Sequence, residues 1–226
     1  MAAKLSKKEL EGPDVFQSGI EKLTDFIAEN KTRFYVGVTA ATLAIIVAIG
    51  IYFYWNNYQT SAVEIYAKAQ NNLIKNGEKP EAAKESAAVF KGLIDKYPQS
   101  WSAKMAHYQL GNIYYNLGDI DNAIASYKNY MTSGAADNAG IRFLALTSLG
   151  YCYESKKDYK SALDYFEQAQ KSNNTGFEVI GYRNIARIYE QMNDRKKALE
   201  NYQNALQKTT DPSMSLFIKR KISSLS

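Results

Sequence analysis

The feature that most constrains this fold is a long uncharged apolar stretch near the N-terminus. No charged residue occurs between Arg33 and Glu64, and residues 34–55 are apolar enough and long enough to cross a bilayer as a helix. A helix buried in a soluble core is the alternative, but such helices are usually shorter and keep a polar stripe. The sequence therefore predicts a transmembrane helix over residues 34–55. Aromatic residues stand at both of its ends, as expected at membrane interfaces: Phe34, Tyr35, Tyr52, Phe53, Tyr54, Trp55 and Tyr58.

The flanks of this stretch predict its orientation. The apolar run begins after 33 residues, is longer than the apolar region of a typical signal peptide, and is followed by no cleavage-site pattern. It is therefore predicted to stay as an uncleaved signal anchor. Lys22, Lys31 and Arg33 precede it, whereas the first basic residue beyond Trp55 is Lys68. Because positive flanks remain inside, we expect the N-terminus in the cytoplasm and the rest of the chain outside.

Residues 1–33 form the predicted cytoplasmic tail. The first dozen residues are predicted to be disordered. After them, Phe16, Ile20, Leu23 and Ile27 recur at helical spacing, with Asp14 placed as an N-cap. This pattern predicts one amphipathic helix. It could lie on the membrane surface or dock a partner, and a juxtamembrane helix without a partner is the alternative.

One pattern then recurs three times. A small residue on one helix is followed 12 positions later by an alanine, and an aromatic residue stands four positions beyond that alanine. A polar turn ending in aspartate separates the two helices in every copy. The copies are Leu110, Gly111, Tyr114, Asp119, Ala123 and Tyr127; Leu149, Gly150, Tyr153, Asp158, Ala162 and Phe166; and Ile185, Ala186, Tyr189, Asp194, Ala198 and Tyr202.

This pattern resembles the tetratricopeptide repeat, a pair of antiparallel helices. The resemblance implies an all-α fold, with the transmembrane helix followed by a helical solenoid. Residues 103–211 would hold three repeats. Residues 133–134 and 137–140 lengthen the first junction and residues 173–176 the second. Residues 56–102 would form a degenerate pair with Phe90 as its aromatic residue. Residues 212–226 would form an amphipathic capping helix that carries Met214, Phe217, Ile218, Ile222 and Leu225.

The residues that carry enzyme chemistry are scarce. The chain has a net charge of +5, but its basic residues are scattered among acidic ones, which argues against a nucleic-acid surface. His107 is the only histidine and Cys152 the only cysteine; both stand within repeats and are predicted to pack rather than react. There is no phosphate-binding glycine loop or metal-ligand cluster. We therefore predict no enzyme activity, cofactor, metal or small-molecule substrate.

The predicted function is protein binding by shape. In such solenoids the first helix of each pair lines the concave face, where aromatic, amide and cationic side chains suit an extended peptide or a partner's loop. The alternative for each residue is an ordinary solvated surface. The charge pattern of a groove that clamps a C-terminal carboxylate is absent, and that mode is not predicted. The candidate groove residues are Tyr108, Asn112, Tyr115, Thr147, Tyr151, Arg183 and Arg187.

Three short segments narrow the resemblance. Residues 26–31 read Phe-Ile-Ala-Glu-Asn-Lys, residues 54–59 read Tyr-Trp-Asn-Asn-Tyr-Gln, and residues 221–226 read Lys-Ile-Ser-Ser-Leu-Ser. With the single span, they resemble the YfgM-like ancillary subunit of the bacterial Sec translocon. That resemblance implies a bacterial inner-membrane protein with a periplasmic repeat domain, bound to translocon subunits, periplasmic chaperones or translocating polypeptides. The alternatives are a scaffold for cell division or outer-membrane assembly, or an organelle import receptor.

Overall fold

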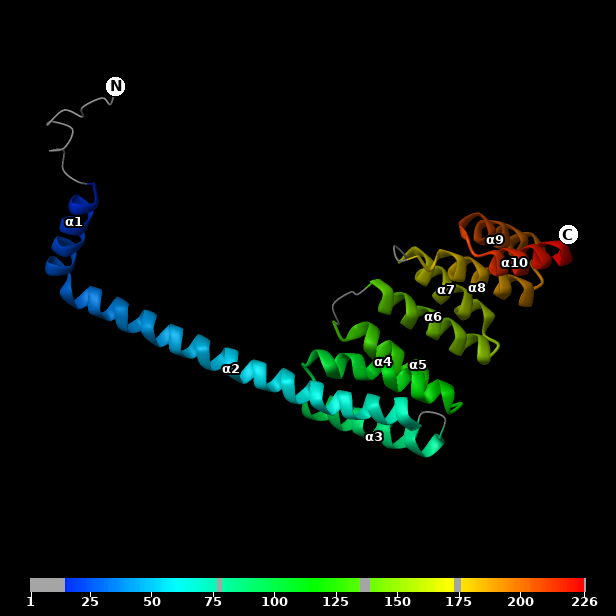
Figure 1. Ribbon diagram of the computed structural model, residues 1–226, viewed down its shortest axis with the longest axis horizontal. Helices are drawn as coiled ribbons and strands as arrows, with labels where there is room; N and C mark the ends of the chain where they lie inside the picture. Colours follow the sequence, from blue (N-terminus) through cyan, green and yellow to red (C-terminus); the bar gives the residue numbers. More distant parts are fainter. Residues whose placement is uncertain (1–14, 77–78, 135–138, 173–175, 226) are drawn as a thin grey trace, which may run out of the picture. The chain divides into compact units, whose positions relative to one another are not determined.

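The computed structural model describes residues 15–76, 79–134, 139–172 and 176–225. Within these ranges it contains ten α-helices and no strand, which confirms the predicted all-α class (Figure 1). The chain divides into two compact units, Met1–Asn56 and Asn57–Ser226. The predicted disordered segment and the predicted cap at Asp14 lie outside the described residues.

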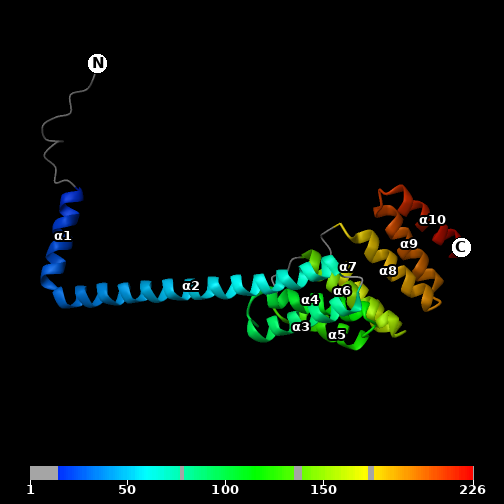
Figure 2. The same ribbon diagram turned by 60° about the horizontal axis from the view of Figure 1, so that its bottom comes forward.

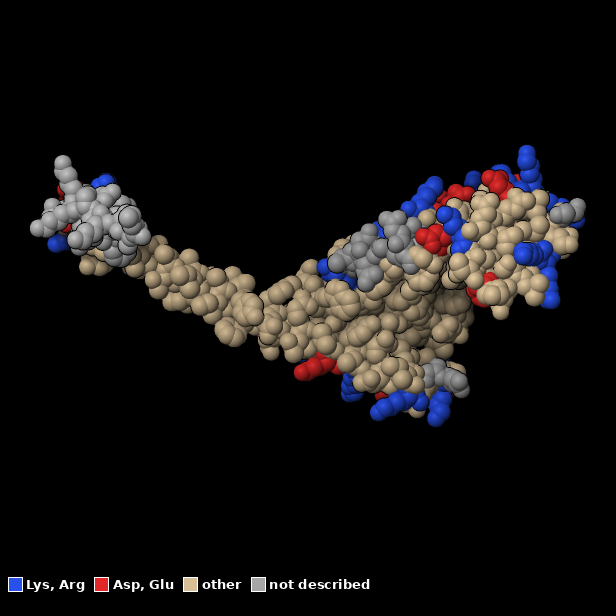
Figure 3. Space-filling model, turned by 45° about the horizontal axis from the view of Figure 1, so that its top comes forward, with Lys and Arg blue, Asp and Glu red and all other residues tan. Residues whose placement is uncertain are grey.

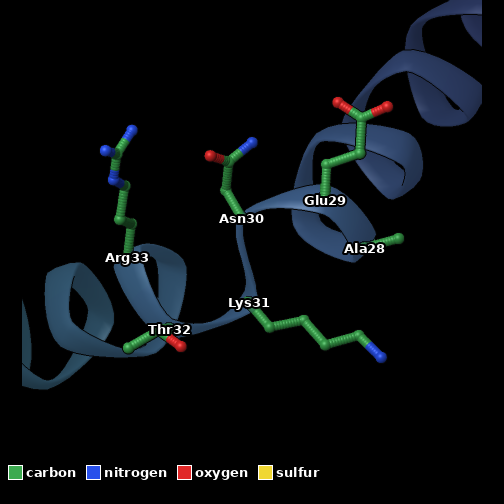
Figure 4. Close-up of a pocket in the computed structure, with 6 residues that line it drawn as sticks. All are labelled: Ala28, Glu29, Asn30, Lys31, Thr32 and Arg33. Atoms are coloured by element: carbon green, nitrogen blue, oxygen red, sulfur yellow. The ribbon is translucent and has the colours of Figure 1, made fainter.

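The first unit begins with α1 (Val15–Glu29), the predicted amphipathic helix. Three of its apolar side chains are exposed: Ile20 at 46%, Leu23 at 56% and Phe26 at 56%. α2 (Lys31–Asn76) follows directly, and the amide of Asn30 donates to the Phe26 carbonyl at 2.9 Å at the junction. Figure 4 shows the open hollow at this junction, which has a volume of about 430 Å³ and is lined by the six consecutive residues 28–33. Because one chain turn forms it, we assign it to the bend and not to a binding site.

The apolar part of α2 is largely exposed within the described residues. Its large side chains, such as Ile45 at 60% and Tyr54 at 69%, are mostly exposed, and its most apolar window has no buried residue. Figure 3 shows this stretch without charged side chains. The helix is long and apolar enough to cross a membrane.

The second unit consists of packed antiparallel helices (Figure 2). The end of α2 pairs with α3 (Pro80–Lys96), where Phe90 is fully buried in a core cluster with Ala62 and Ala69. Three further pairs follow in chain order, and within each pair the two helices pack against each other. They are α4 (Trp101–Asn116) with α5 (Ile120–Thr132), α6 (Ala139–Ser155) with α7 (Tyr159–Lys171), and α8 (Glu178–Gln191) with α9 (Arg195–Lys208).

The turn inside each of these three pairs has the same construction. A residue with positive φ ends the first helix: Gly118 at 78°, Lys157 at 59° and Asn193 at 60°. The aspartate that follows caps the second helix, as when the Asp158 carboxylate accepts from the Ser161 amide at 3.1 Å. Asp119 and Asp194 do the same. The equal turns fix an equal antiparallel geometry in every pair.

The small residue of each first helix is needed because an aromatic ring lies against it. A Cβ built on Gly111 would lie 2.5 Å from a ring carbon of Tyr127, and one on Gly150 would lie 2.6 Å from Phe166. Ala186 and Tyr202 share the corresponding buried cluster in the third pair. The sequence pattern thus corresponds to one physical contact repeated along the solenoid.

The last helix, α10 (Pro212–Leu225), covers the end of the stack. Ile218 is fully buried against Ala186, Tyr202 and Ala205, so the helix caps the third repeat as predicted. Phe217 differs from the other apolar residues assigned to this cap, because it is 44% exposed.

Candidate functional site

The candidate residues on α4 are half-buried and support the second helix of their own pair. Asn112 accepts a hydrogen bond from the Tyr127 hydroxyl at 2.7 Å through its Oδ1. The ring of Tyr108 lies 5.8 Å from that of Tyr127 and 5.7 Å from that of Tyr130. Burial raises the pKa of Tyr108, so its hydroxyl stays protonated and can donate. Tyr115 packs at the edge of the same cluster.

The two candidates on α6 differ from each other. Thr147 is only 6% exposed, so it contributes almost nothing to the surface on which we predicted it. The reason is its position, since it lies on the side of α6 that packs into the solenoid. Tyr151 is half-buried: its ring meets Phe166 edge-on at 5.2 Å, and its hydroxyl donates to Asn184 Oδ1 at 3.1 Å.

The candidates on α8 join Tyr151 in one cavity. The guanidinium of Arg187 lies 5.5 Å from the centre of the Tyr151 ring and forms an ion pair with Glu154. Arg183 lies one turn away on the same helix. Together Tyr151, Arg183 and Arg187 line a cavity of about 290 Å³, which is completed by Asn184, Tyr202, Phe217 and Lys221.

The structure therefore divides the seven candidates into groups. Tyr151, Arg183 and Arg187 share the cavity between α6, α8, α9 and α10, whereas Tyr108, Asn112 and Tyr115 lie on α4 and do not line it. Sequence reasoning missed Asn184 and Lys221. The sequence held one indication for Asn184, because Gln109, the residue at the same position of the first repeat, is also a polar amide. In the structure Gln109 likewise bonds a tyrosine: its Nε2 donates to the Tyr66 hydroxyl at 3.1 Å.

The single cysteine and the single histidine of the chain lie outside this cavity. Cys152 is fully buried, and desolvation raises the pKa of its thiol to about 11, so it stays protonated at neutral pH. Burial lowers the pKa of half-buried His107, which lines a second cavity of about 310 Å³ with Asp95, Tyr114 and others. Among the described residues, no three His, Cys, Asp or Glu side chains are grouped to hold a metal ion.

The fold and this surface define a helical-repeat protein, and comparison with known families gives its membership. The sequence profile of the tetratricopeptide repeat-like domain matches residues 27–226, so the chain belongs to that family. Domains of this kind generally bind proteins, and the chain is a tetratricopeptide-like protein-binding scaffold.

Two solved structures illustrate the likeness. PilF of Pseudomonas aeruginosa is 17% identical, with 74% of this chain and 68% of that chain covered and a TM-score of 0.56. MamA of Desulfovibrio magneticus RS-1 is 18% identical, with 73% of this chain and 88% of that chain covered and a TM-score of 0.56. At such identities the likeness shows the fold alone. No curated protein matches the sequence.

Proposed function

We propose that the protein is a membrane-anchored scaffold of the bacterial cell envelope. It would cross the inner membrane once, with its N-terminus in the cytoplasm and its repeats in the periplasm. There it would associate with the Sec translocon and pass translocated polypeptides to periplasmic chaperones. The observation that carries the proposal is α2, because one continuous helix holds both the exposed apolar stretch and the first helix of the protein-binding solenoid.

The chemistry of the first helices supports polypeptide as the bound species. Tyr108, Tyr115 and Tyr151 offer aromatic surface, Asn112 an amide, and Arg183 and Arg187 cationic groups with planar donors. Such groups bind extended chains by stacking and by hydrogen bonds to the peptide backbone. The translocon as partner rests on the resemblance of the segments at residues 26–31, 54–59 and 221–226 to the YfgM-like subunit.

The partner is tested by purification. Full-length protein solubilised in detergent is expected to co-purify with the Sec channel or with periplasmic chaperones, before or after crosslinking in cells. Recovery of neither would contradict the translocon assignment. Recovery of cell-division proteins, outer-membrane assembly proteins or an organelle import machine would replace it with the corresponding scaffold.

The binding face is tested by photo-crosslinking from single positions. A photoreactive residue at Tyr151 or Arg187, on the first helices, is expected to capture polypeptide. The control is the same residue at exposed Lys160 on α7, the second helix of a pair. Equal capture from all three positions would mean that this surface is not the binding face.

The orientation is tested by introducing new cysteines and labelling them with a membrane-impermeant thiol reagent. The cells have a permeabilised outer membrane and an intact inner membrane. Gln207→Cys on α9 is expected to react, whereas Lys22→Cys on α1 is expected to be protected; both positions are exposed. Wild type is the background control, because its only thiol is buried. The opposite labelling pattern would reverse the proposed topology.

A further inference from the structure

The turn between α3 and α4 is bonded to α2 at the start of the second unit. The Gln99 amide donates to the Tyr58 hydroxyl at 3.1 Å, and the Trp101 amide donates to the Gln59 side-chain oxygen at 3.1 Å. The Tyr97 ring packs edge-on against the Tyr58 ring, with the ring centres 5.0 Å apart. In Figure 1 the turn lies beside α2, where that helix meets the solenoid. These contacts hold the turn against one short stretch of α2.

The sequence of this turn leaves a tryptophan on the surface. Pro98 cannot continue α3, and Ser100 begins α4 as its N-cap by accepting from the Ala103 amide at 3.0 Å. Ser100 is fully buried, whereas Trp101, the first residue of α4, is 50% exposed. A single exposed apolar side chain is ordinary on a protein surface. The place of Trp101 in the molecule therefore decides what its exposure means.

That place is close to the end of the proposed span. Gln59 follows Trp55, the last residue of the predicted span, by four residues on the same continuous helix. Four residues of α-helix rise by about 6 Å. The headgroup layer of a bilayer is about 5–7 Å thick on each side. When residues 34–55 span the bilayer, the turn bonded to Tyr58 and Gln59 is therefore at the depth of the lipid headgroups. Tryptophan and tyrosine are enriched at that depth, because their rings are apolar and also carry a polar group.

We propose that the turn between α3 and α4 rests on the membrane surface, with the Trp101 ring inserted among the lipid headgroups. This inference rests on the proposed function, because it requires residues 34–55 to lie in a bilayer. The solenoid would then be held at two points, α2 and Trp101, and could not rotate about the axis of α2. Its α2–α3 end would lie at the membrane and α10 away from it.

The charges around the turn suit this contact. Residues 95–104 contain two lysines, Lys96 and Lys104, against one aspartate, Asp95. The Lys96 amine lies 5.3 Å from the centre of the Tyr97 ring, so a cation accompanies the aromatic side chains of the turn. Basic residues close to a bilayer are attracted to anionic lipid headgroups. The turn thus combines aromatic insertion with a weak electrostatic attraction.

The test uses the two tryptophans of the chain, Trp55 and Trp101, as separate fluorescent probes. Full-length Trp55→Phe and Trp101→Phe each keep one of them. Both variants are placed in nanodiscs of phosphatidylcholine and phosphatidylglycerol, in which part of the phosphatidylcholine carries a nitroxide quencher on its headgroup. We expect Trp101 to lose as large a share of its emission to the nitroxide as Trp55 does. We also expect Trp101 to be shielded from acrylamide, a quencher dissolved in the water.

The control places a tryptophan at the other end of the solenoid. Phe217 is 44% exposed on α10, which lies at the opposite end of the helical stack from α2 (Figure 2). Phe217→Trp combined with Trp55→Phe and Trp101→Phe therefore carries one tryptophan remote from the proposed contact. Its emission is expected to resist the nitroxide and to be quenched by acrylamide. Circular dichroism confirms that all three variants are folded.

The outcomes separate this inference from the proposed function. If the nitroxide quenches Trp55 but not Trp101, the surface contact is wrong and the membrane anchor stands. If the nitroxide quenches Trp101 but acrylamide reaches it as freely as the control tryptophan, the ring is near the lipid without touching it, and the contact is again wrong. Equal nitroxide quenching in all three variants would equally contradict a contact specific to the turn. If neither Trp55 nor Trp101 is quenched by the nitroxide, the span itself fails, and the proposed function fails with this inference.

Discussion

α2 is one continuous helix with two parts in different environments. Its first half is residues 31–56, in the first unit, and its second half is residues 57–76, in the second unit. In the first half Ile45 and Ile49 are 60% and 51% exposed, whereas in the second half Ala62 and Ala69 are fully buried or nearly so. The second half has a neighbour, since Ser86 on α3 donates to the Ala69 carbonyl at 3.2 Å. Small residues let α3 approach closely there. In the first half, large branched side chains such as Ile45 and Ile49 are mostly exposed, which suits a lipid environment.

The largest expected effect tests that lipid environment. Ile45→Asp combined with Ile49→Asp places two carboxylates in the proposed span, at a cost of about 3 kcal/mol each in a bilayer. We expect most of the protein to leave the membrane fraction after carbonate extraction. Val63→Asp with Ile74→Asp is the matched control, because these residues are also exposed, at 51% and 79%, but lie in the second half of α2. Equal extraction of both variants would mean that the first half is not a membrane span.

A second substitution compares two glycines in opposite environments. A leucine at Gly150 would collide with the Phe166 ring, whereas Gly50 in the first half of α2 has nothing within 4 Å of an added Cβ. Gly150→Leu should lower the free energy of unfolding by about 3 kcal/mol. Gly50→Leu should leave it unchanged. Urea unfolding in detergent, followed by circular dichroism, measures both. A stable Gly150→Leu variant would contradict the assigned contact.

A smaller effect is expected at the turns. Asp194→Ala removes the cap in which the Asp194 carboxylate accepts from the Lys197 amide at 3.1 Å. The expected loss of stability is about 1 kcal/mol. Glu200→Ala, an exposed acidic residue within α9, controls for the lost charge and should change stability little. The same urea experiment distinguishes them, and equal midpoints would show that the cap contributes nothing.

The smallest expected effect is an increase in stability. Lys157 has a φ of 59°, a conformation that glycine adopts with less strain, and the corresponding residue of the first repeat is Gly118. Lys157→Gly should therefore raise the free energy of unfolding by about 0.5 kcal/mol. Lys160→Gly, within α7, should lower it by about 1 kcal/mol. A loss in both variants would mean that Lys157 has contacts that outweigh its backbone strain.

Much of the fold follows from local sequence. The position of the long apolar helix, the three helix pairs and their turns could be predicted, because each depends on residues close together in the chain. Gly118 with Asp119 predicts a turn through backbone preference alone. Gly111 and Tyr127 are 16 residues apart, but the threefold recurrence of their spacing reveals the contact. The contact could be predicted from the sequence because its spacing recurs in three repeats.

The candidate site could be predicted only in part, since it is formed by residues that do not recur. The register of the first helices identified Tyr151, Arg183 and Arg187, but it also placed Thr147 on the surface, where the structure buries it. Register gives the face of a helix, whereas burial depends on how closely the next helix packs. By itself, the sequence determined an apolar helix followed by stacked helical pairs. Only the tertiary structure decided that α10 closes the cavity beside Tyr151, Arg183 and Arg187, because its lining residues Phe217 and Lys221 lie at least 30 residues further along the chain.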